Sequence, residues 1–220
     1  MLSVVIPALN AATTLPAVLA ALDGAADEVI VADGGSTDGT VALARRLGAL
    51  VVVLQGSHGA RLAAGCAAAT GDWLLLLRAD TRLAADWEHA TARMMAGSPR
   101  RAAYFRFALE AGEPRARRLE RFLAWRSTRF GLPAAEQGLL ISRALLDDVG
   151  GVRPLPVLAE LDLARRLGRQ RLAGLATPAT TTAVRWRRDG TWRRGIRELG
   201  CLAVHCLGLP PAAIARLLAG

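Results

Sequence analysis

Four short apolar runs mark the first third of the chain, at Leu2–Ile6, Val29–Ala32, Leu50–Leu54 and Trp73–Leu77. Each run is uninterrupted and bounded by turn residues, which is typical of strands that are buried on both faces of a sheet. Segments of helical length and period separate the runs, at Thr13–Leu22, Asp38–Leu47 and Arg61–Ala69. This alternation predicts an α/β fold with a mostly parallel, Rossmann-like central sheet flanked by helices.

The rest of the chain has a looser pattern. It predicts strands at Ala102–Ala108 and Gly138–Ser142, and helices at Asp86–Met95, Val157–Leu167, Arg193–Leu207 and Pro211–Leu218. Between the two strands lies an Arg-rich amphipathic segment, Glu113–Pro133, in which Phe122, Leu123, Trp125 and Phe130 interrupt the arginines. Two interpretations of this segment stay open: a solvated helix with an apolar underside, or a surface that lines a binding groove or rests on anionic lipid.

The stretch DGGSTDGT begins at Asp33, directly after the second predicted strand. In open α/β sheets, ligands bind beyond the carboxyl ends of the strands. Gly34 and Gly35 let the backbone turn there and approach a ligand closely, and a polar residue after them can cap the next helix. The stretch predicts a ligand-facing loop, with an ordinary turn in which Asp33 is satisfied locally as the alternative.

The 28 basic side chains are all arginines, because the chain contains no lysine, and they exceed the 19 acidic side chains to give a net charge of +9. This excess favours polyanionic or phosphate-bearing partners. The arginines are scattered over predicted helices rather than interleaved with stacking aromatic residues, so we expect no nucleic-acid partner. The stretch PALNAATTLP after the first strand has no G-x-G-x-x-G fingerprint and no P-loop is present, which argues against a dehydrogenase and a P-loop NTPase.

Three cysteines, Cys66, Cys201 and Cys206, form no CxxC pair, and their odd number predicts a reducing compartment rather than a disulfide framework. Cys201 and His205 make at most two ligands, so they predict no metal site.

The uncharged stretch near the C-terminus is too short to span a bilayer, and the N-terminus lacks the features of a signal peptide. We therefore expect a cytoplasmic protein.

Four motifs carry a family resemblance: SVVIPALN at the N-terminus, DGGSTDGT after the second strand, GDWLLLLRADT around the fourth, and EQG further on. In order and spacing they resemble the family 2 glycosyltransferases, which have the GT-A fold. The stretches GGVRPLPVLAELDLARRLGR and VRWRRDGTWRR bring the chain closest to a small bacterial subgroup, the radical-SAM/selenodomain-associated glycosyltransferases. The resemblance implies a single domain over 1–220, with a nucleotide-binding half (1–82), an acceptor and catalytic half (83–187) and a C-terminal helical extension (188–220).

The resemblance also implies a reaction, the transfer of a hexosyl or related group from a nucleotide-diphosphate sugar, usually with a divalent cation and with inversion. It places Glu160 as the general base, with Asp162 in reserve, and Asp80 as a ligand of Mg²⁺ or Mn²⁺. Asp33 would accept hydrogen bonds from the nucleoside. The implied nucleotide-sugar-binding residues are Pro7, Ala8, Asn10, Asp33, Gly34, Gly35, Arg61, Arg78, Asp80, Glu136, Gln137, Arg185 and Trp186.

The chain departs from the family pattern at several charged positions. Ala11 and Ala159 stand where the family has acidic residues. Arg78 replaces a His of the subgroup and Glu136 an Asp. On an extended segment, Arg78 points the same way as Asp80 and competes with a metal for its carboxylate, so we expect weak metal binding. An open alternative is a weakened or inactive homologue that only binds nucleotide sugar.

The donor base and the acceptor depend on variable loops, which a fold resemblance does not define. A UDP-sugar is the default expectation for the donor. The acceptor is either lipid-linked, in keeping with the Arg-rich segment, or a small soluble molecule. Peripheral contact with the inner membrane surface is therefore an alternative to a wholly cytoplasmic location.

Overall fold

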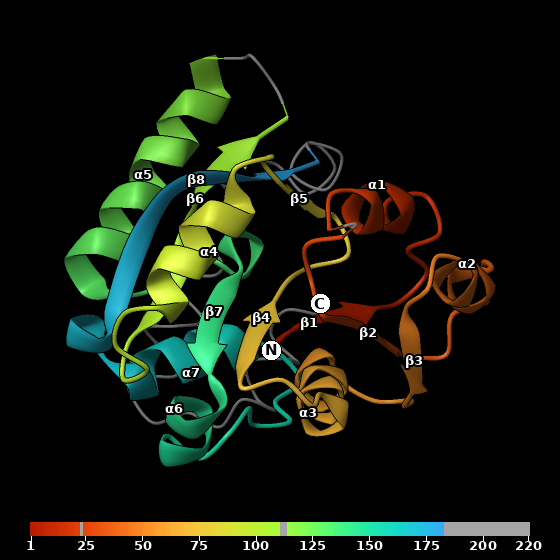
Figure 1. The fold of residues 1–220 in the computed structure, drawn as a ribbon. Coiled ribbons are helices and arrows are strands. Elements are labelled where there is room, and N and C mark those ends of the chain that lie inside the picture. The colour runs from red at the N-terminus through yellow and green to blue at the C-terminus, as the bar shows by residue number, and fades with distance from the viewer. Residues whose placement is uncertain (23, 111–113, 183–220) are drawn as a thin grey trace.

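The computed structural model describes residues 1–22, 24–110 and 114–182, which form a sheet with helices on both faces (Figure 1). The strands are β1 (Leu2–Ala8), β2 (Glu28–Asp33), β3 (Leu50–Val53), β4 (Trp73–Leu76), β5 (Thr81–Leu83), β6 (Ala102–Leu109), β7 (Leu139–Ser142) and β8 (Leu172–Thr181). The helices are α1 (Leu15–Ala20), α2 (Thr40–Arg46), α3 (His58–Ala68), α4 (Trp87–Met95), α5 (Pro114–Phe130), α6 (Arg143–Asp148) and α7 (Ala159–Leu167), with short 3₁₀ helices η1 (Ala135–Gln137) and η2 (Arg169–Arg171). The helices expected at Arg193–Leu207 and Pro211–Leu218 lie outside the described residues.

The described strands join in one sheet, in the order β3-β2-β1-β4-β7-β6-β8-β5. β1 pairs in parallel with β2 and β4, and β2 pairs in parallel with β3, which confirms the predicted parallel arrangement of the first four strands. β7 runs antiparallel to β4 and β6, whereas β8 runs parallel to β6 and antiparallel to β5. The carboxyl ends of β1, β2 and β4 therefore meet at one edge of the sheet.

β3 forms one end of the sheet, and the prediction of burial on both faces is wrong for this strand. Leu50 and Val53 are 50% and 55% exposed, because no described strand pairs with the outer side of β3. β1 and β4 lie in the interior of the sheet and are buried at every position, as predicted.

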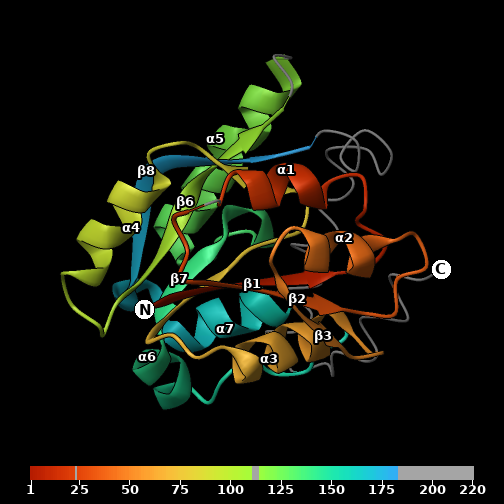
Figure 2. The ribbon, with the colours of Figure 1, turned by 45° about the vertical axis from the view of Figure 1, so that its right-hand side comes forward.

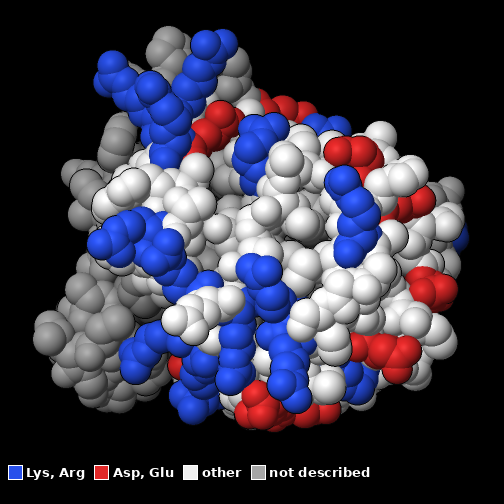
Figure 3. Space-filling view, turned by 60° about the vertical axis from the view of Figure 1, so that its left-hand side comes forward, with Lys and Arg blue, Asp and Glu red and all other residues white. Residues whose placement is uncertain are grey.

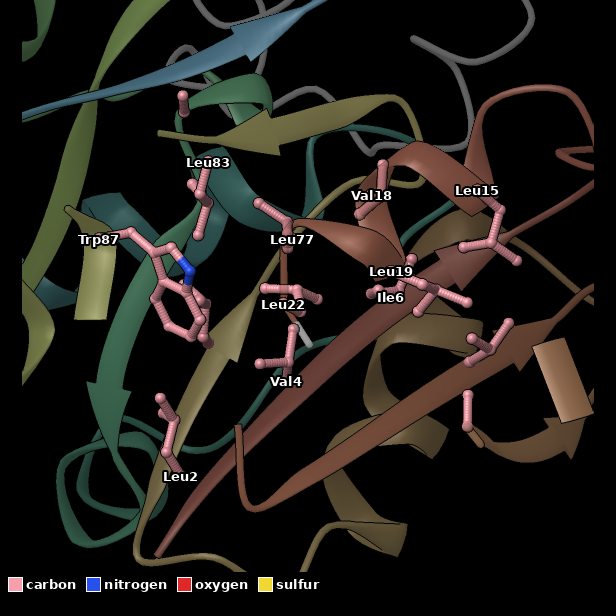
Figure 4. Close-up of a cluster of buried hydrophobic side chains, with 14 of the residues drawn as sticks. Leu2, Val4, Ile6, Leu15, Val18, Leu19, Leu22, Leu77, Leu83 and Trp87 are labelled. Carbon is pink, nitrogen blue, oxygen red and sulfur yellow. The ribbon is translucent and has the colours of Figure 1, made fainter. Parts of the chain in front are cut away.

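Two helical layers enclose the sheet, with α1, α2 and α4 on one face and α3, α6 and α7 on the other (Figure 2). The strands divide their apolar side chains between these layers because successive residues point to opposite faces. Val4 and Ile6 of β1 join the first core with Leu15 and Trp87 (Figure 4). Val5 joins the second core, so β1 anchors both layers.

The Arg-rich segment forms the single helix α5, and its predicted apolar underside is confirmed. Leu119 and Leu123 pack with Phe107 of β6 and with Ala134 in a third, smaller cluster. Along the described part of the chain, the helices are too short or too polar to traverse a lipid bilayer.

Some elements were not predicted, namely β5, β8 and α6. β8 has ten residues, but its sequence LAGLATPATT is rich in small residues and only partly buried, so it shows no clear period. Helix α3 starts at His58, before the predicted Arg61, because Ser57 caps it: Ser57 Oγ accepts a hydrogen bond from Ala60 N at 3.1 Å.

Candidate functional site

The loops after β1 and β2 are tied together at the carboxyl edge of the sheet. Asn10 donates its backbone N–H to Ser36 Oγ at 2.8 Å, and its side-chain Oδ1 accepts from Thr37 N at 2.9 Å. Ala11 N donates to Thr40 Oγ1 at 2.8 Å. Asn10 has a φ of 50°, a left-handed conformation that asparagine adopts more readily than most residues. Asn10 thus links the two loops through hydrogen bonds of both its backbone and its side chain.

Asp33 is wholly buried at the end of β2, where it pairs with Ala8, the residue after Pro7 in β1. Its Oδ2 accepts from the backbone N–H groups of Gly35 and Ser36, each at 2.8 Å, and its Oδ1 accepts from Ser36 Oγ at 2.5 Å. The locally satisfied carboxylate is therefore the arrangement present in the structure. Asp33 shapes the loop, and its contact with a nucleoside stays a prediction.

Helix α3 places Arg61 against this loop. A Cβ on Gly34 would lie 2.7 Å from Arg61 Nη1, so the guanidinium packs directly against the backbone of this loop. Nη1 donates to Gly56 O at 2.9 Å, while the buried Nε has no hydrogen-bond partner among the described residues. Burial lowers the pKa of Arg61, and the charge of Asp33 acts in the opposite direction. A buried donor without a partner suits an oxygen of an anionic ligand.

A second charged cluster follows β4. Arg78 donates from Nε to Asp80 Oδ1 at 3.1 Å and from Nη2 to Oδ2 at 3.4 Å, and Glu136 Oε1 lies 3.9 Å from Nε. Burial lowers the pKa of Arg78, but the charges of Asp80, Glu136 and Glu160 outweigh burial and hold that pKa above its usual value. Arg78 is a permanent cation beside several carboxylates.

Glu160 lies in the first turn of α7, where its Oε1 is 2.5 Å from His58 Nε2 in the first turn of α3. The two side chains are 15% and 25% exposed, respectively. Burial raises the pKa of Glu160, but the charge and hydrogen bond of His58, followed by the charge of Arg78, outweigh it and bring the pKa below the ordinary 4.5. The site thus holds an ionised carboxylate with partial access to solvent.

Asp162, the reserve candidate, is engaged by the scaffold. Its carboxylate is 4% exposed and accepts from Arg166 Nε at 2.9 Å and from Arg153 Nη1 at 3.3 Å. The pair with Arg153 ties α7 to the segment before it, whereas the pair with Arg166 lies within α7. The reserve role of Asp162 as a base stays a prediction.

Gln137 is likewise bonded to its surroundings. Its Oε1 accepts from Ser127 Oγ at 2.8 Å and from Ala134 N at 2.9 Å, and its Nε2 donates to Phe105 O at 2.8 Å. The buried amide holds η1 between α5 and β6, which fixes the neighbouring Glu136 beside Arg78.

Charge interactions and hydrogen bonds link several of the predicted residues in pairs. The pairs are Asp33 with Arg61, Glu160 with Arg78, and Arg78 with Asp80, and Glu160 also pairs with His58. Arg61 and His58 both belong to α3, which therefore links the loop after β2 to α7. Arg185 and Trp186 lie outside the described residues. The sequence interpretation gave no role to His58, although its place just beyond the third predicted strand put it at the carboxyl edge of the sheet.

Asp80 is the candidate ligand for a divalent cation. Asp80 offers two carboxylate oxygens, but both accept hydrogen bonds from Arg78. Within the described residues, no group of three or more His, Cys, Asp or Glu side chains could hold a metal ion. This part of the chain therefore does not supply a metal site by itself, because Mg²⁺ and Mn²⁺ prefer several oxygen ligands.

The profile of Glycosyl transferase family 2 matches residues 3–151. A search among curated proteins gave no match.

Solved structures with a similar fold include TarS 1–349 from S. aureus in complex with UDP-GlcNAc, with 17% identity and a TM-score of 0.63 over 82% of this chain. The chain spans 58% of the length of that TarS structure. The glucosyl-3-phosphoglycerate synthase from Mycobacterium tuberculosis, solved with Mn²⁺ and UDP-Glc, has 22% identity and a TM-score of 0.65 over 96% of this chain and 80% of that chain. The architecture is therefore the GT-A fold.

Proposed function

The chain belongs to glycosyl transferase family 2, and on that premise we propose that it transfers a sugar from a nucleotide-diphosphate donor to an acceptor hydroxyl, with inversion. The observation that carries the proposal is the ionised, partly exposed Glu160, whose charge acts on the same Arg78 that binds Asp80. We assign the donor nucleotide to residues 1–82 and the acceptor to residues 83–187. The motifs quoted above support the radical-SAM/selenodomain-associated subgroup.

In the proposed reaction, Glu160 takes the proton of the acceptor hydroxyl while the acceptor oxygen forms a bond to the anomeric carbon. The bond between that carbon and the diphosphate oxygen breaks, and the diphosphate leaves with the electron pair. Attack opposite the leaving group inverts the anomeric centre. A general base in such a position contributes roughly 10²–10⁴-fold to the rate.

The donor-binding half of the proposal rests on the guanidinium groups of Arg61 and Arg78, because guanidinium groups bind phosphate oxygens well. Two structures of similar fold hold UDP-GlcNAc and UDP-Glc, which supports a UDP-hexose as the donor. A thermal-shift screen of UDP-, GDP- and dTDP-sugars tests this choice. A cognate donor at 100 times its dissociation constant stabilises the protein by about 2.7 kcal/mol, and equal shifts with all three bases would contradict a preference for UDP.

We further propose that donor binding depends only weakly on a divalent cation, because Arg78 already neutralises Asp80. Calorimetric titration of UDP with Mn²⁺ and with EDTA should give affinities within about tenfold, or 1.4 kcal/mol. Arg78→Met removes both hydrogen bonds that Arg78 donates to Asp80 and should increase the metal dependence. Arg82→Met is the control, since Arg82 pairs with the half-exposed Glu110 instead. A much larger gain from Mn²⁺ in the wild-type protein contradicts the proposal.

On the acceptor side, we propose that the outer face of α5 rests on an anionic membrane surface. The exposed residues of this face are Arg117, Arg118, Arg121, Ala124, Trp125, Thr128, Arg129 and Phe130. The Trp125 ring centroid lies 5.1 Å from that of Phe130 and 6.0 Å from that of Phe122, so an aromatic group stands among the arginines. Basic side chains are spread over this side of the molecule (Figure 3). Such a face suits the interface of anionic lipids.

Vesicle sedimentation tests the membrane contact. Binding to phosphatidylglycerol vesicles should exceed binding to phosphatidylcholine vesicles, and Arg118→Glu with Arg121→Glu should remove the difference, at about 1 kcal/mol per arginine near the surface. Arg45→Glu with Arg46→Glu is the matched control on α2, which lies on the other side of the molecule in Figure 1. Equal loss in both double variants would show that net charge alone is responsible.

Turnover separates an active enzyme from a silent nucleotide-sugar binder, an alternative that Ala11 and Ala159 keep open. Glu160→Gln should abolish transfer and donor hydrolysis while UDP binding persists. Wild-type protein that binds donor but neither transfers nor hydrolyses it would support the silent homologue. Turnover that survives in Glu160→Gln would remove Glu160 from its role as base.

A further inference from the structure

We propose that His58 is a positioning residue for Glu160, which its Nε2 holds by one carboxylate oxygen while the other oxygen is left for the acceptor hydroxyl. The inference rests on the proposed function of Glu160 as general base. The contact is direct, with 2.5 Å between His58 Nε2 and Glu160 Oε1. It also joins residues from two helices that are remote in the sequence.

The start of α3 is fitted closely to the segment that precedes α7, which brings the two side chains together. Gly59 N donates to Leu155 O at 3.1 Å, and Ser57 Oγ donates to Pro154 O at 3.3 Å. A Cβ on Gly59 would lie 2.5 Å from Leu155 O and 2.7 Å from Arg153 O, so no larger side chain fits there. His58 therefore stands between two residues that both contact this segment.

The position of Glu160 in this contact depends on the backbone at the start of α7. Leu158, the N-cap residue, has a φ of 62°, a left-handed conformation that a branched side chain seldom adopts. Such strain persists only where the surrounding contacts determine the backbone, and it gathers at functional sites. Arg153 pairs with Asp162 one turn into the helix, so the segment that contacts α3 also contacts α7. The first turn of α7, which carries Glu160, is thus tied to this segment.

The charges around Glu160 give His58 a measurable effect. The described groups from other elements that act on this carboxylate are His58 on α3 and Arg78 after β4. Burial raises the pKa of Glu160, and His58 makes the larger of the two opposing contributions. Removing the imidazole therefore raises the pKa of Glu160. A protonated carboxyl cannot accept a proton from the acceptor, so activity should be lost at a higher pH than in the wild-type protein.

The test compares His58→Leu with His58→Gln in transfer assays over a range of pH. His58→Leu should lower kcat by about 10–100-fold, since small misplacements of a reacting group have effects of this size, and should leave the KM of the donor within about twofold. The acidic limb of the pH profile should move to higher pH. His58→Gln retains an N–H donor and should recover most of the lost kcat. A loss of kcat without movement of the acidic limb would overturn the inference.

Two further measurements distinguish a failure of the role of His58 from a failure of the role of Glu160. If Glu160→Gln is inactive while His58→Leu keeps the wild-type rate and pH profile, only the role of His58 fails. Turnover that survives in Glu160→Gln contradicts the proposed function itself. Should His58→Leu fold poorly, the imidazole ¹⁵N resonances of His58 in the folded protein serve instead. They should change in Glu160→Gln but not in Asp147→Asn, an exposed carboxylate of α6, and unchanged resonances in both variants would overturn the inference.

Discussion

Gly59→Ala is the substitution for which the structure makes the sharpest prediction. The added methyl group would lie 2.5 Å from Leu155 O, 2.7 Å from Arg153 O and 2.7 Å from Leu155 N. All three atoms belong to the backbone, so no side-chain rotation can relieve the overlap. Either α3 or the segment before α7 must move, and the hydrogen bond from Gly59 N to Leu155 O must stretch or break.

The expected cost can be estimated from these contacts. Overpacking costs about 1–3 kcal/mol, and the lost backbone hydrogen bond adds about 0.5–1.5 kcal/mol. Alanine returns up to about 1 kcal/mol through its higher helix propensity. A net loss of about 2 kcal/mol lowers the melting temperature of a protein of this size by about 4–8 °C.

Thermal and urea unfolding of Gly59→Ala check this value, with Gly56→Ala as the matched control. The nearest atom to a Cβ on Gly56 is Ala60 Cβ at 3.4 Å, an ordinary contact, so this variant should be near neutral. Gly59→Ala should also lose activity, because the movement separates His58 from Glu160. Equal stability of the two variants, with equal activity, would refute the close fit between α3 and the segment before α7.

Further predictions concern three other sites. Gln137→Ala leaves the partners of a buried amide unpaired and should cost at least about 2 kcal/mol in denaturant unfolding. Cys66 is buried and burial raises the pKa of its thiol to about 12, so peptide mapping should find it unmodified by iodoacetamide until the protein unfolds. Since the pKa of Glu160 is lowered on folding, its carboxylate stabilises the protein above pH 4.5, and the stability difference from Glu160→Gln should shrink as the pH falls below that value.

The sequence predicts β1 and β4 well because these two strands are buried along their whole length. The runs that became β1 and β4 are uninterrupted and apolar, and the structure buries them throughout. β8 was missed because a strand of small residues with Gly174 and Pro178 carries no periodic signal. Its place in the sheet depends on pairing with β6 and β5, and such pairing over long sequence distances cannot be read from local pattern.

The candidate site was predicted in part. The sequence motifs identified Asp80, Glu136 and Glu160 as site residues. In the structure, the charges of all three act on Arg78. The competition of Arg78 for Asp80 was predicted from their spacing and agrees with the two hydrogen bonds. The pairing of His58 with Glu160 could not be predicted, because it depends on the packing of α3 against a segment about a hundred residues later.

β4 lies between β1 and β7 in the finished sheet, yet β7 is synthesised only after β5, α4, β6 and α5. In a nascent chain that has completed its first four strands, the apolar strand Trp73–Leu76 is therefore an edge strand with one unpaired side. Exposed edge strands of this kind can pair with strands of other chains and so promote aggregation. We expect fragments that stop before Leu139 to accumulate as insoluble material, and the growing polypeptide to depend on chaperones until Ser142 has left the ribosome.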